Sequence, residues 1–425
     1  MTFDYLTVVV LLGTSLLGGV AGVVGTFAVL RRRALVGDVL AHAALPGLCL
    51  AFLVLGTVQF AGLLVGALLS GLAGLALITL VCHATRTKED AALGIVLSTF
   101  FGVGIVLLSI VQQQASGGQA GLKSYIFGQA GLMGRRDVYL IGTVAFVGLC
   151  AMTLFYKELK LLSFDPGFAR AQGWPTLRLD LGLMAVLALV IIIGLPAVGV
   201  VLMAAMLILP GATARFWTDR LGRMLPLAGI VGAGSAAGAT LLSAGMLTAW
   251  LGFDLFAFGD TTANLPTGPL IVLCGTAVLL VSVLFSPRRG VIAAMGRTAR
   301  SRWRTGLENL LSTLYELGER QPDECPEVPL QAVLDRRRWR PWHARTLLWW
   351  ASWRGLIERS DHAARLTQQG AQHAARIVRA RRLWEAFLIH GVNIAPDHVH
   401  RDADAIEHLL PAELVERLEA ELPKS

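Results

Sequence analysis

Nine apolar segments constrain what this chain can fold into more than any other feature. They cover residues 6–30, 36–55, 60–82, 91–111, 138–156, 180–195, 197–216, 225–247 and 267–285. A helix needs about 20 apolar residues to span the hydrocarbon core of a bilayer. The two segments on either side of Leu195-Pro196 are shorter and can also be interpreted as one broken helix. The pattern predicts an all-α polytopic membrane protein with about nine transmembrane helices.

Charged residues separate this apolar part from a polar tail. Residues 1–295 hold 17 Lys/Arg and 11 Asp/Glu, whereas residues 296–425 hold 20 and 18. With 55% hydrophobic residues, the chain is too apolar for an ordinary soluble enzyme of this size. We therefore expect a membrane domain followed by a soluble domain.

The basic loops between the apolar segments predict the orientation. They are Arg31-Arg32-Arg33, Arg86 with Lys88, 157–178, 215–223 and Arg288-Arg289. With nine spans and an outside N-terminus, all five fall on the cytoplasmic side, as the positive-inside rule requires. The exception is Arg135-Arg136, at the end of the Gln- and Gly-rich segment 112–136, which stays outside. We expect a multi-pass protein of the bacterial inner membrane with a cytoplasmic C-terminal domain.

The tail has the outline of a winged helix-turn-helix. Helices are expected near 307–319, 330–337 and 341–356, then a two-stranded stretch around 356–366, then helices near 368–391, 396–409 and 411–422. Three helices followed by a hairpin are typical of that motif. The expected organisation is a transmembrane domain at 1–288, a linker helix at 289–306, a winged-helix-like domain at 307–370 and a helical domain at 371–425.

Four segments of the membrane part resemble the permeases of the manganese/zinc/iron family of ABC importers. They are RRRALVGDVLAHAALPG at 31–47, LSFDPGFARAQG at 162–173, the stretch from VGVV to ILPGATAR at 198–215, and NLPTGPLIVL at 264–273. The resemblance implies a divalent metal as the substrate, with manganese foremost and iron or zinc as alternatives. It also implies three partners: a cytoplasmic ATP-binding subunit, an extracytoplasmic metal-binding protein and a second permease subunit in a homo- or heterodimer.

Asp38 and His42 are the ionisable pair in the membrane part that the sequence indicates as a candidate site, independently of the resemblance. Their i, i+4 spacing places them on one face of a predicted membrane helix. Ionisable residues inside a membrane are costly and usually face a bundle interior or a pathway, and a carboxylate with an imidazole suits manganese, iron or zinc. The pair is a candidate for the metal pathway. The alternative is a hydrogen-bonded pair that packs two helices.

The cytoplasmic stretch after residue 161 is the candidate for ATPase docking. Asp165-Pro166 is a start signal for a short helix. In the family that the chain resembles, this stretch docks onto the ATPase subunit; the alternative is a plain loop between two helices. That assigns Ser163, Phe164, Asp165, Pro166, Gly167, Phe168, Ala169 and Arg170 to the contact. The sequence has no G-x-x-x-x-G-K-[ST] phosphate loop, so we expect a transport subunit, not an enzyme, with ATP hydrolysed by the partner.

The tail resembles a second family, the iron- and manganese-dependent repressors. The similar segments are LSTLYEL at 311–317, RLTQQG at 365–370, RLWE at 382–385 and residues 399–410. Positions 400, 404, 407 and 408 share one side of a helix, and two imidazoles with two carboxylates fit manganese or ferrous iron. The resemblance implies one metal site with Glu385 and His400, and another with Asp404, Glu407 and His408.

The tail departs from that second family at ligand positions. It has Arg381 where the family's helix often has a histidine, and Asn309 and Ser312 where the first helix supplies ligands. The sequence therefore leaves open whether the sites are complete. Metal is expected as the substrate and as a candidate regulator through a metal-sensor or dimerisation-like domain, and no cofactor is expected to be bound permanently.

The segment 342–354 takes the place of a DNA-recognition helix. It carries four tryptophans, which suit protein packing better than a DNA groove, so we do not expect DNA binding. The preceding run Arg336-Arg337-Arg338 is more typical of a solvated or lipid-headgroup-facing patch.

Two other functions compete with metal import. A permease for cobalamin or siderophores would share the docking segment, but Asp38, His42 and a metal-sensing tail favour a bare ion. A membrane-tethered, metal-dependent transcriptional regulator would need far fewer than nine spans for its anchor.

Overall fold

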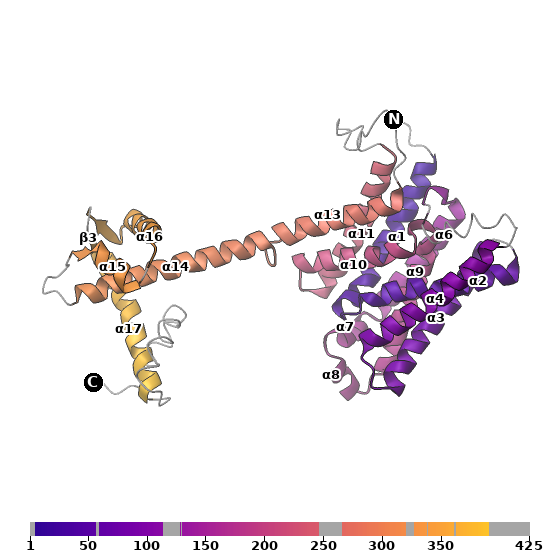
Figure 1. Cartoon of the computed structure of the whole chain (residues 1–425), viewed down its shortest axis with the longest axis horizontal. Helices are drawn as coiled ribbons and strands as arrows, with labels where there is room; N and C mark the ends of the chain where they lie inside the picture. The colour runs from indigo at the N-terminus through magenta and orange to yellow at the C-terminus, as the bar shows by residue number, and fades with distance from the viewer. Residues whose placement is uncertain are drawn as a thin grey trace. The chain divides into compact units, whose positions relative to one another are not determined.

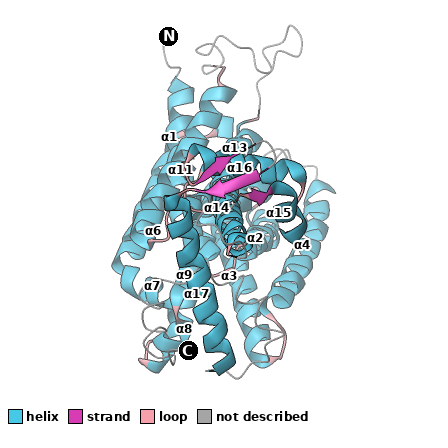
Figure 2. Ribbon diagram, turned by 90° about the vertical axis from the view of Figure 1, so that its left-hand side faces the viewer, coloured by secondary structure: helices cyan, strands magenta, loops and turns pink. Residues whose placement is uncertain are grey.

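The computed structural model describes residues 5–56, 59–113, 128, 130–245, 266–319, 327–337, 339–360 and 363–390. The chain divides into two compact units, Met1–Ala293 and Ala294–Ser425, and each is described by itself. The predicted class is confirmed: the first unit is a bundle of apolar helices and the second is a small, mostly helical domain with a three-stranded sheet (Figures 1 and 2).

Apolar helices build the first unit. In the part of the chain that the structure describes, eight are long and apolar enough to cross a membrane. They are α1 (Tyr5–Leu30), α2 (Leu35–Leu55), α3 (Phe60–Ala84), α4 (Glu89–Gln113), α6 (Arg135–Leu154), α9 (Thr176–Val198), α11 (Leu221–Ser243) and α13 (Thr267–Phe285). A shorter apolar helix, α10 (Val200–Trp217), follows α9 directly. These nine helices coincide with the nine predicted segments.

The junction of α9 and α10 decides between one broken helix and two. Pro196 is tolerated inside α9, and the break falls three residues later at Gly199. Gly199 has φ 94°, a left-handed conformation that glycine adopts without steric cost. The two short segments are therefore separate helices.

Small residues bring the helices of the bundle together. α1 packs along α10 and α11, and α2 packs along α3 and α4. A Cβ atom on Gly18 of α1 would overlap the carbonyl oxygen of Gly232 on α11, and one on Gly232 would overlap the carbonyl oxygen of Gly18. Such contacts allow close backbone approach. In lipid, where helices gain no hydrophobic free energy by associating, the resulting van der Waals packing drives their association.

Each end of the bundle has its own polar contacts. At the end where α1 begins, Arg135 donates a hydrogen bond to the Tyr5 hydroxyl and lies over its ring. At the other end, Asp219 forms an ion pair of 2.5 Å with Arg289, which follows α13. Two short helices, α7 (Tyr156–Phe164) and α8 (Pro166–Ala171), lie at the end opposite the N-terminus (Figures 1 and 2). A single 3₁₀ turn, Ala130–Leu132, precedes α6.

The second unit has the winged-helix topology expected from the sequence. Its elements in chain order are α14 (Val291–Gly318), β1 (Val328–Pro329), α15 (Leu330–Arg337), α16 (Pro341–Trp353), β2 (Ile357–Arg359), β3 (Ala363–Leu366) and α17 (Gln368–His390). The strands form an antiparallel sheet in the order β1-β3-β2. Leu310, Leu311 and Leu347 are buried in its core.

Two details of this unit differ from the prediction. The expected linker helix and the helix after it form one continuous helix, α14, because neither Gly296 nor Gly306 interrupts it. Strand β1 was not expected, since two residues carry no alternating pattern. The helices expected at 396–409 and 411–422 lie outside the described residues.

Candidate functional site

The candidate metal pathway begins on α2, where Asp38 and His42 face each other. His42 Nε2 lies 3.5 Å from Asp38 Oδ1, and the two side chains are 18% and 34% exposed. The i, i+4 spacing in an unbroken helix brings them together, as predicted.

His42 also contacts α4 and has one ring nitrogen buried. Its ring meets the edge of Phe101 on α4 at a centroid distance of 4.9 Å. Among the described residues, its buried Nδ1 has no hydrogen-bond partner. If Nε2 carries the proton directed at Asp38, Nδ1 presents a lone pair, which is the form of imidazole that binds metals. Pro46 also has no N–H to offer the carbonyl of His42 four residues earlier.

Asp38 and His42 alone would supply only two ligands to a metal ion. Across the described ranges, no three His, Cys, Asp or Glu side chains come together in a way that could hold a metal ion. Manganese, iron and zinc need four to six ligands. A metal at this pair would therefore need further donors from backbone carbonyls, water, residues beyond the described ranges or a second subunit.

A cluster of ion pairs lies just before the start of α2. Arg31 and Arg33 both bind Asp180 in the first turns of α9, with Arg33 Nη1 2.6 Å from Asp180 Oδ2. Arg33 Nε also lies 2.5 Å from Glu89 Oε1 at the start of α4. Burial alone would lower the pKa of the Arg33 guanidinium, but the carboxylates of Asp180 and Glu89 outweigh it and raise that pKa. The cluster thus fixes the starts of α2, α4 and α9 to one another.

The docking segment forms the helices α7 and α8. Asp165 caps α8 by accepting a hydrogen bond of 2.9 Å from the Phe168 N–H, and Pro166 takes the first helical position. Ser163 Oγ donates to the Leu159 carbonyl at 2.7 Å, and Arg170 Nε donates to the Pro166 carbonyl at 3.4 Å. The predicted start signal is therefore present in the structure.

Exposure within this segment shows which side chains a partner can reach. Phe164 and Phe168 are large, apolar and more than half exposed, and Gly167 is exposed as well. Ala169 is buried against the bundle. The sequence indicated the segment as a whole. It did not predict which side chains are exposed and which are buried, because that depends on how α8 packs.

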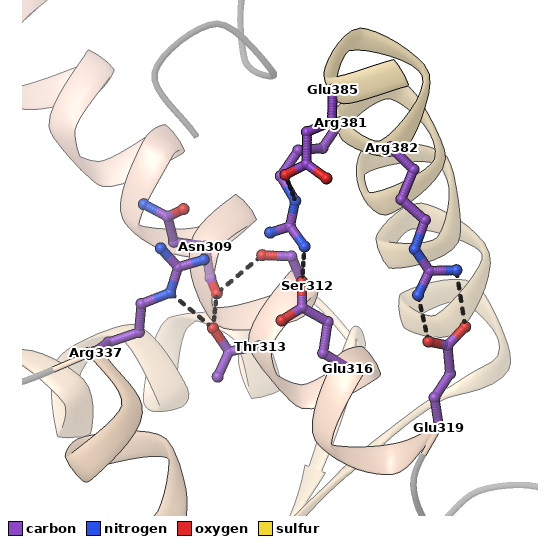
Figure 3. A network of polar contacts seen from close by, with 9 residues as sticks. All are labelled: Asn309, Ser312, Thr313, Glu316, Glu319, Arg337, Arg381, Arg382 and Glu385. Carbon is purple, nitrogen blue, oxygen red and sulfur yellow. Dashed lines mark hydrogen bonds and ion pairs between the residues drawn. The ribbon is translucent and has the colours of Figure 1, made fainter. Parts of the chain in front are cut away.

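In the tail, Glu385 lies beside Arg381 on α17 (Figure 3). Arg381 Nε is 3.7 Å from Glu385 Oε1, and Arg381 Nη2 also pairs with Glu316 on α14. Asn309 and Ser312, at the departing ligand positions, lie on α14 in the same network, with Ser312 Oγ donating to the Asn309 carbonyl at 3.2 Å. Within the described residues, the carboxylates of Glu316 and Glu385 are therefore both paired with the Arg381 guanidinium. His400, Asp404, Glu407 and His408 lie outside the described residues.

Sequence comparisons agree with both halves of this picture. The ABC 3 transport family matches residues 3–286. The iron dependent repressor, metal binding and dimerisation domain matches residues 367–424. The chain belongs to the ABC 3 transport family and is a multi-pass membrane permease whose tail resembles the repressor domain.

Three relatives illustrate the similarity. The chain is 40% identical over 411 residues to the manganese transport system membrane protein MntC of Bacillus subtilis (strain 168), covering 96% of this chain and 90% of the relative. It is 40% identical over 297 residues to the zinc transport system membrane protein TroC of Treponema pallidum (strain Nichols), covering 70% and 94%. The solved structure of PsaBC from Streptococcus pneumoniae in complex with Fab is 29% identical, with a TM-score of 0.56 over 68% of this chain and 94% of the other.

Proposed function

We propose that this chain is the membrane-spanning subunit of an ATP-driven importer of divalent transition metal, with manganese foremost and iron or zinc as alternatives. The observation that carries the proposal is the Asp38–His42 pair on α2, whose carboxylate and imidazole are ligand types that suit such an ion. The names of the manganese and zinc relatives support the same substrate class.

The proposed transport cycle needs three partners. An extracytoplasmic protein delivers the ion at the end of the bundle that holds Tyr5 and Arg135. A second permease subunit completes the pathway, and a cytoplasmic ATP-binding subunit docks at α7 and α8. The exposed Phe164 and Phe168 provide an apolar contact for that subunit. The arginine-rich end lies in the cytoplasm by the positive-inside rule, which also places the tail there.

The tail is proposed to restrain import when internal metal is high. Support comes from the match to a metal-binding and dimerisation domain and from the spacing of His400, Asp404, Glu407 and His408. Glu385 is not part of this proposal, because Arg381 and Glu385 already form an ion pair. The sensing ion would therefore be held by His400, Asp404, Glu407 and His408.

Uptake measurements test the pathway proposal. The full chain with its ATP-binding partner is expressed in cells, and manganese, iron and zinc uptake are compared by competition. Asp38→Ala and His42→Ala should each abolish uptake without changing the amount of protein in the membrane. His83→Ala is the matched control, because His83 is exposed at the end of α3 and, among the described residues, its ring bonds to the Thr79 carbonyl of its own helix, at 3.0 Å. Normal uptake by both α2 variants would remove the pair from the pathway.

A further inference from the structure

Helix α16 presents three tryptophans to its surroundings. Trp342, Trp349 and Trp353 are 61%, 64% and 75% exposed. Exposing an indole ring to water leaves a large apolar surface unburied, and contiguous exposed apolar patches mark sites of interaction with a protein or a membrane. Among the described residues, none of the three belongs to the hydrophobic core of the winged-helix unit.

The three tryptophans form one stripe along the helix. They are spaced by seven and four residues, which places them within about 40° of arc at 100° per residue. The opposite side of α16 is buried, with Ala344, Leu347, Leu348 and Ala351 packed into the core. The stripe is therefore the outward face of α16, and we call Trp342, Trp349 and Trp353 the tryptophan stripe.

The segment that carries the tryptophan stripe is basic. Residues 336–354 contain six arginines and no aspartate or glutamate. Arg345 is exposed and its helical position lies next to the stripe, and Arg354 stacks over the ring of Trp350 at 4.1 Å. A surface with this composition is complementary to an anionic one.

Tryptophan with arginine fits a lipid surface better than a DNA groove. Bases in the major groove are read mainly by Arg, Lys, Asn and Gln, and indole rings do not reproduce those hydrogen bonds. At a membrane interface, the amphipathic indole lies at headgroup level and arginine binds anionic phosphates. The unit is also covalently joined to a membrane protein, so a bilayer is always present at high effective concentration.

We propose that the tryptophan stripe of α16 docks on an anionic bilayer surface. The helix that would read DNA in a winged-helix protein serves here as a peripheral membrane contact, with the rings inserted at headgroup level and the arginines on lipid phosphates. This proposal depends on the chain's place in a membrane and not on the metal that it transports, so the two can fail separately.

Tryptophan quenching by brominated lipid tests the proposal. The full chain is placed in nanodiscs of brominated or ordinary phospholipid, either zwitterionic or containing phosphatidylglycerol. The emission of the stripe is the difference between the wild type and a triple variant, Trp342→Ser/Trp349→Ser/Trp353→Ser. The matched control is Trp350→Phe, which removes a half-buried indole from the same helix.

The expected result is that the stripe's emission is quenched in brominated anionic nanodiscs and much less in zwitterionic ones. High salt should weaken the quenching, and Arg345→Gln should weaken docking about fivefold, the contribution of one basic residue near an anionic surface. The Trp350→Phe protein should be quenched like the wild type. Equal emission in brominated and ordinary lipid would overturn the proposal. Two other results would also overturn it. In one, the stripe's emission changes with duplex DNA and not with lipid; in the other, the stripe becomes buried only after the ATP-binding subunit is added.

Discussion

Arg381 on α17 forms an ion pair with Glu316 on α14, and the two side chains are only 14% and 22% exposed. The same guanidinium reaches Glu385 one turn further along α17 (Figure 3). A permanently charged cation thus lies between two carboxylates from different helices. It links α17 to α14 in the way that a divalent ion links carboxylate ligands, but it does not depend on metal supply.

Replacing Arg381 by alanine should loosen α17. It would leave the largely buried carboxylate of Glu316 without its cation, which typically costs about 3 kcal/mol. Hydrogen exchange of residues 368–390 in the full chain should therefore become faster by roughly two orders of magnitude. Arg382→Ala is the control, because its pair with Glu319 is well exposed and such pairs contribute about 0–1 kcal/mol. Equal exchange rates in the two variants would contradict a structural link at Arg381.

Metal binding by the tail should depend on its last segment and not on Glu385. In the full chain, Glu407→Ala/His408→Ala should greatly weaken manganese binding, whereas Glu385→Gln should change it little, because Glu385 pairs with Arg381. Carboxylate and imidazole ligands must be deprotonated, so affinity should fall as the pH is lowered through their pKa values. Equilibrium binding of manganese checks both points. Measuring it also in the Asp38→Ala protein separates binding at the pathway from binding at the tail. If the full chain loses as much affinity with Glu385→Gln as with the double variant, the assignment is wrong.

Contact with the ATP-binding subunit should be lost when an exposed ring of α8 becomes charged. Phe168→Asp puts a carboxylate where an apolar contact is expected, so the ATP-binding subunit should no longer co-purify. Gly167→Arg is a second exposed probe, because a Cβ at Gly167 would meet Asp165 Oδ1 at 3.4 Å, an ordinary contact, and a basic side chain does not repel that carboxylate. Ala169→Asp does not distinguish docking from folding, since Ala169 is buried. Arg136→Asp, exposed at the start of α6 near the opposite end, is the control. Undiminished co-purification of the Phe168→Asp chain would place the contact elsewhere.

Local sequence patterns predicted the helices, whereas the details of the sites depend on contacts between residues that are far apart in the sequence. Hydropathy located nine apolar helices within a few residues, and the Asp38–His42 pair followed from helical spacing alone. The Arg381–Glu316 pair joins residues 65 apart in the sequence, so no periodicity predicts it. The exposure of Phe168 beside the buried Ala169 likewise depends on how a six-residue helix packs against the bundle.

Asp180 should couple the docking helices to the metal pathway. It lies near the start of α9, shortly after α8, and its carboxylate holds Arg31 and Arg33 immediately before the helix that carries Asp38 and His42. Asp180→Asn keeps the shape of the side chain but removes its charge, so both arginines lose an ionic partner. ATP hydrolysis by the docked subunit should continue while metal uptake falls, lowering the number of ions moved per ATP.

The matched control for Asp180→Asn is Asp219→Asn, whose pairs with Arg288 and Arg289 are exposed and far in sequence from α2. A double-mutant cycle with Phe168→Ala measures the energetic coupling directly, because two independent sites would give additive effects. A coupling free energy near zero, or an unchanged ratio of uptake to hydrolysis, would show that movement of α8 reaches α2 by another route.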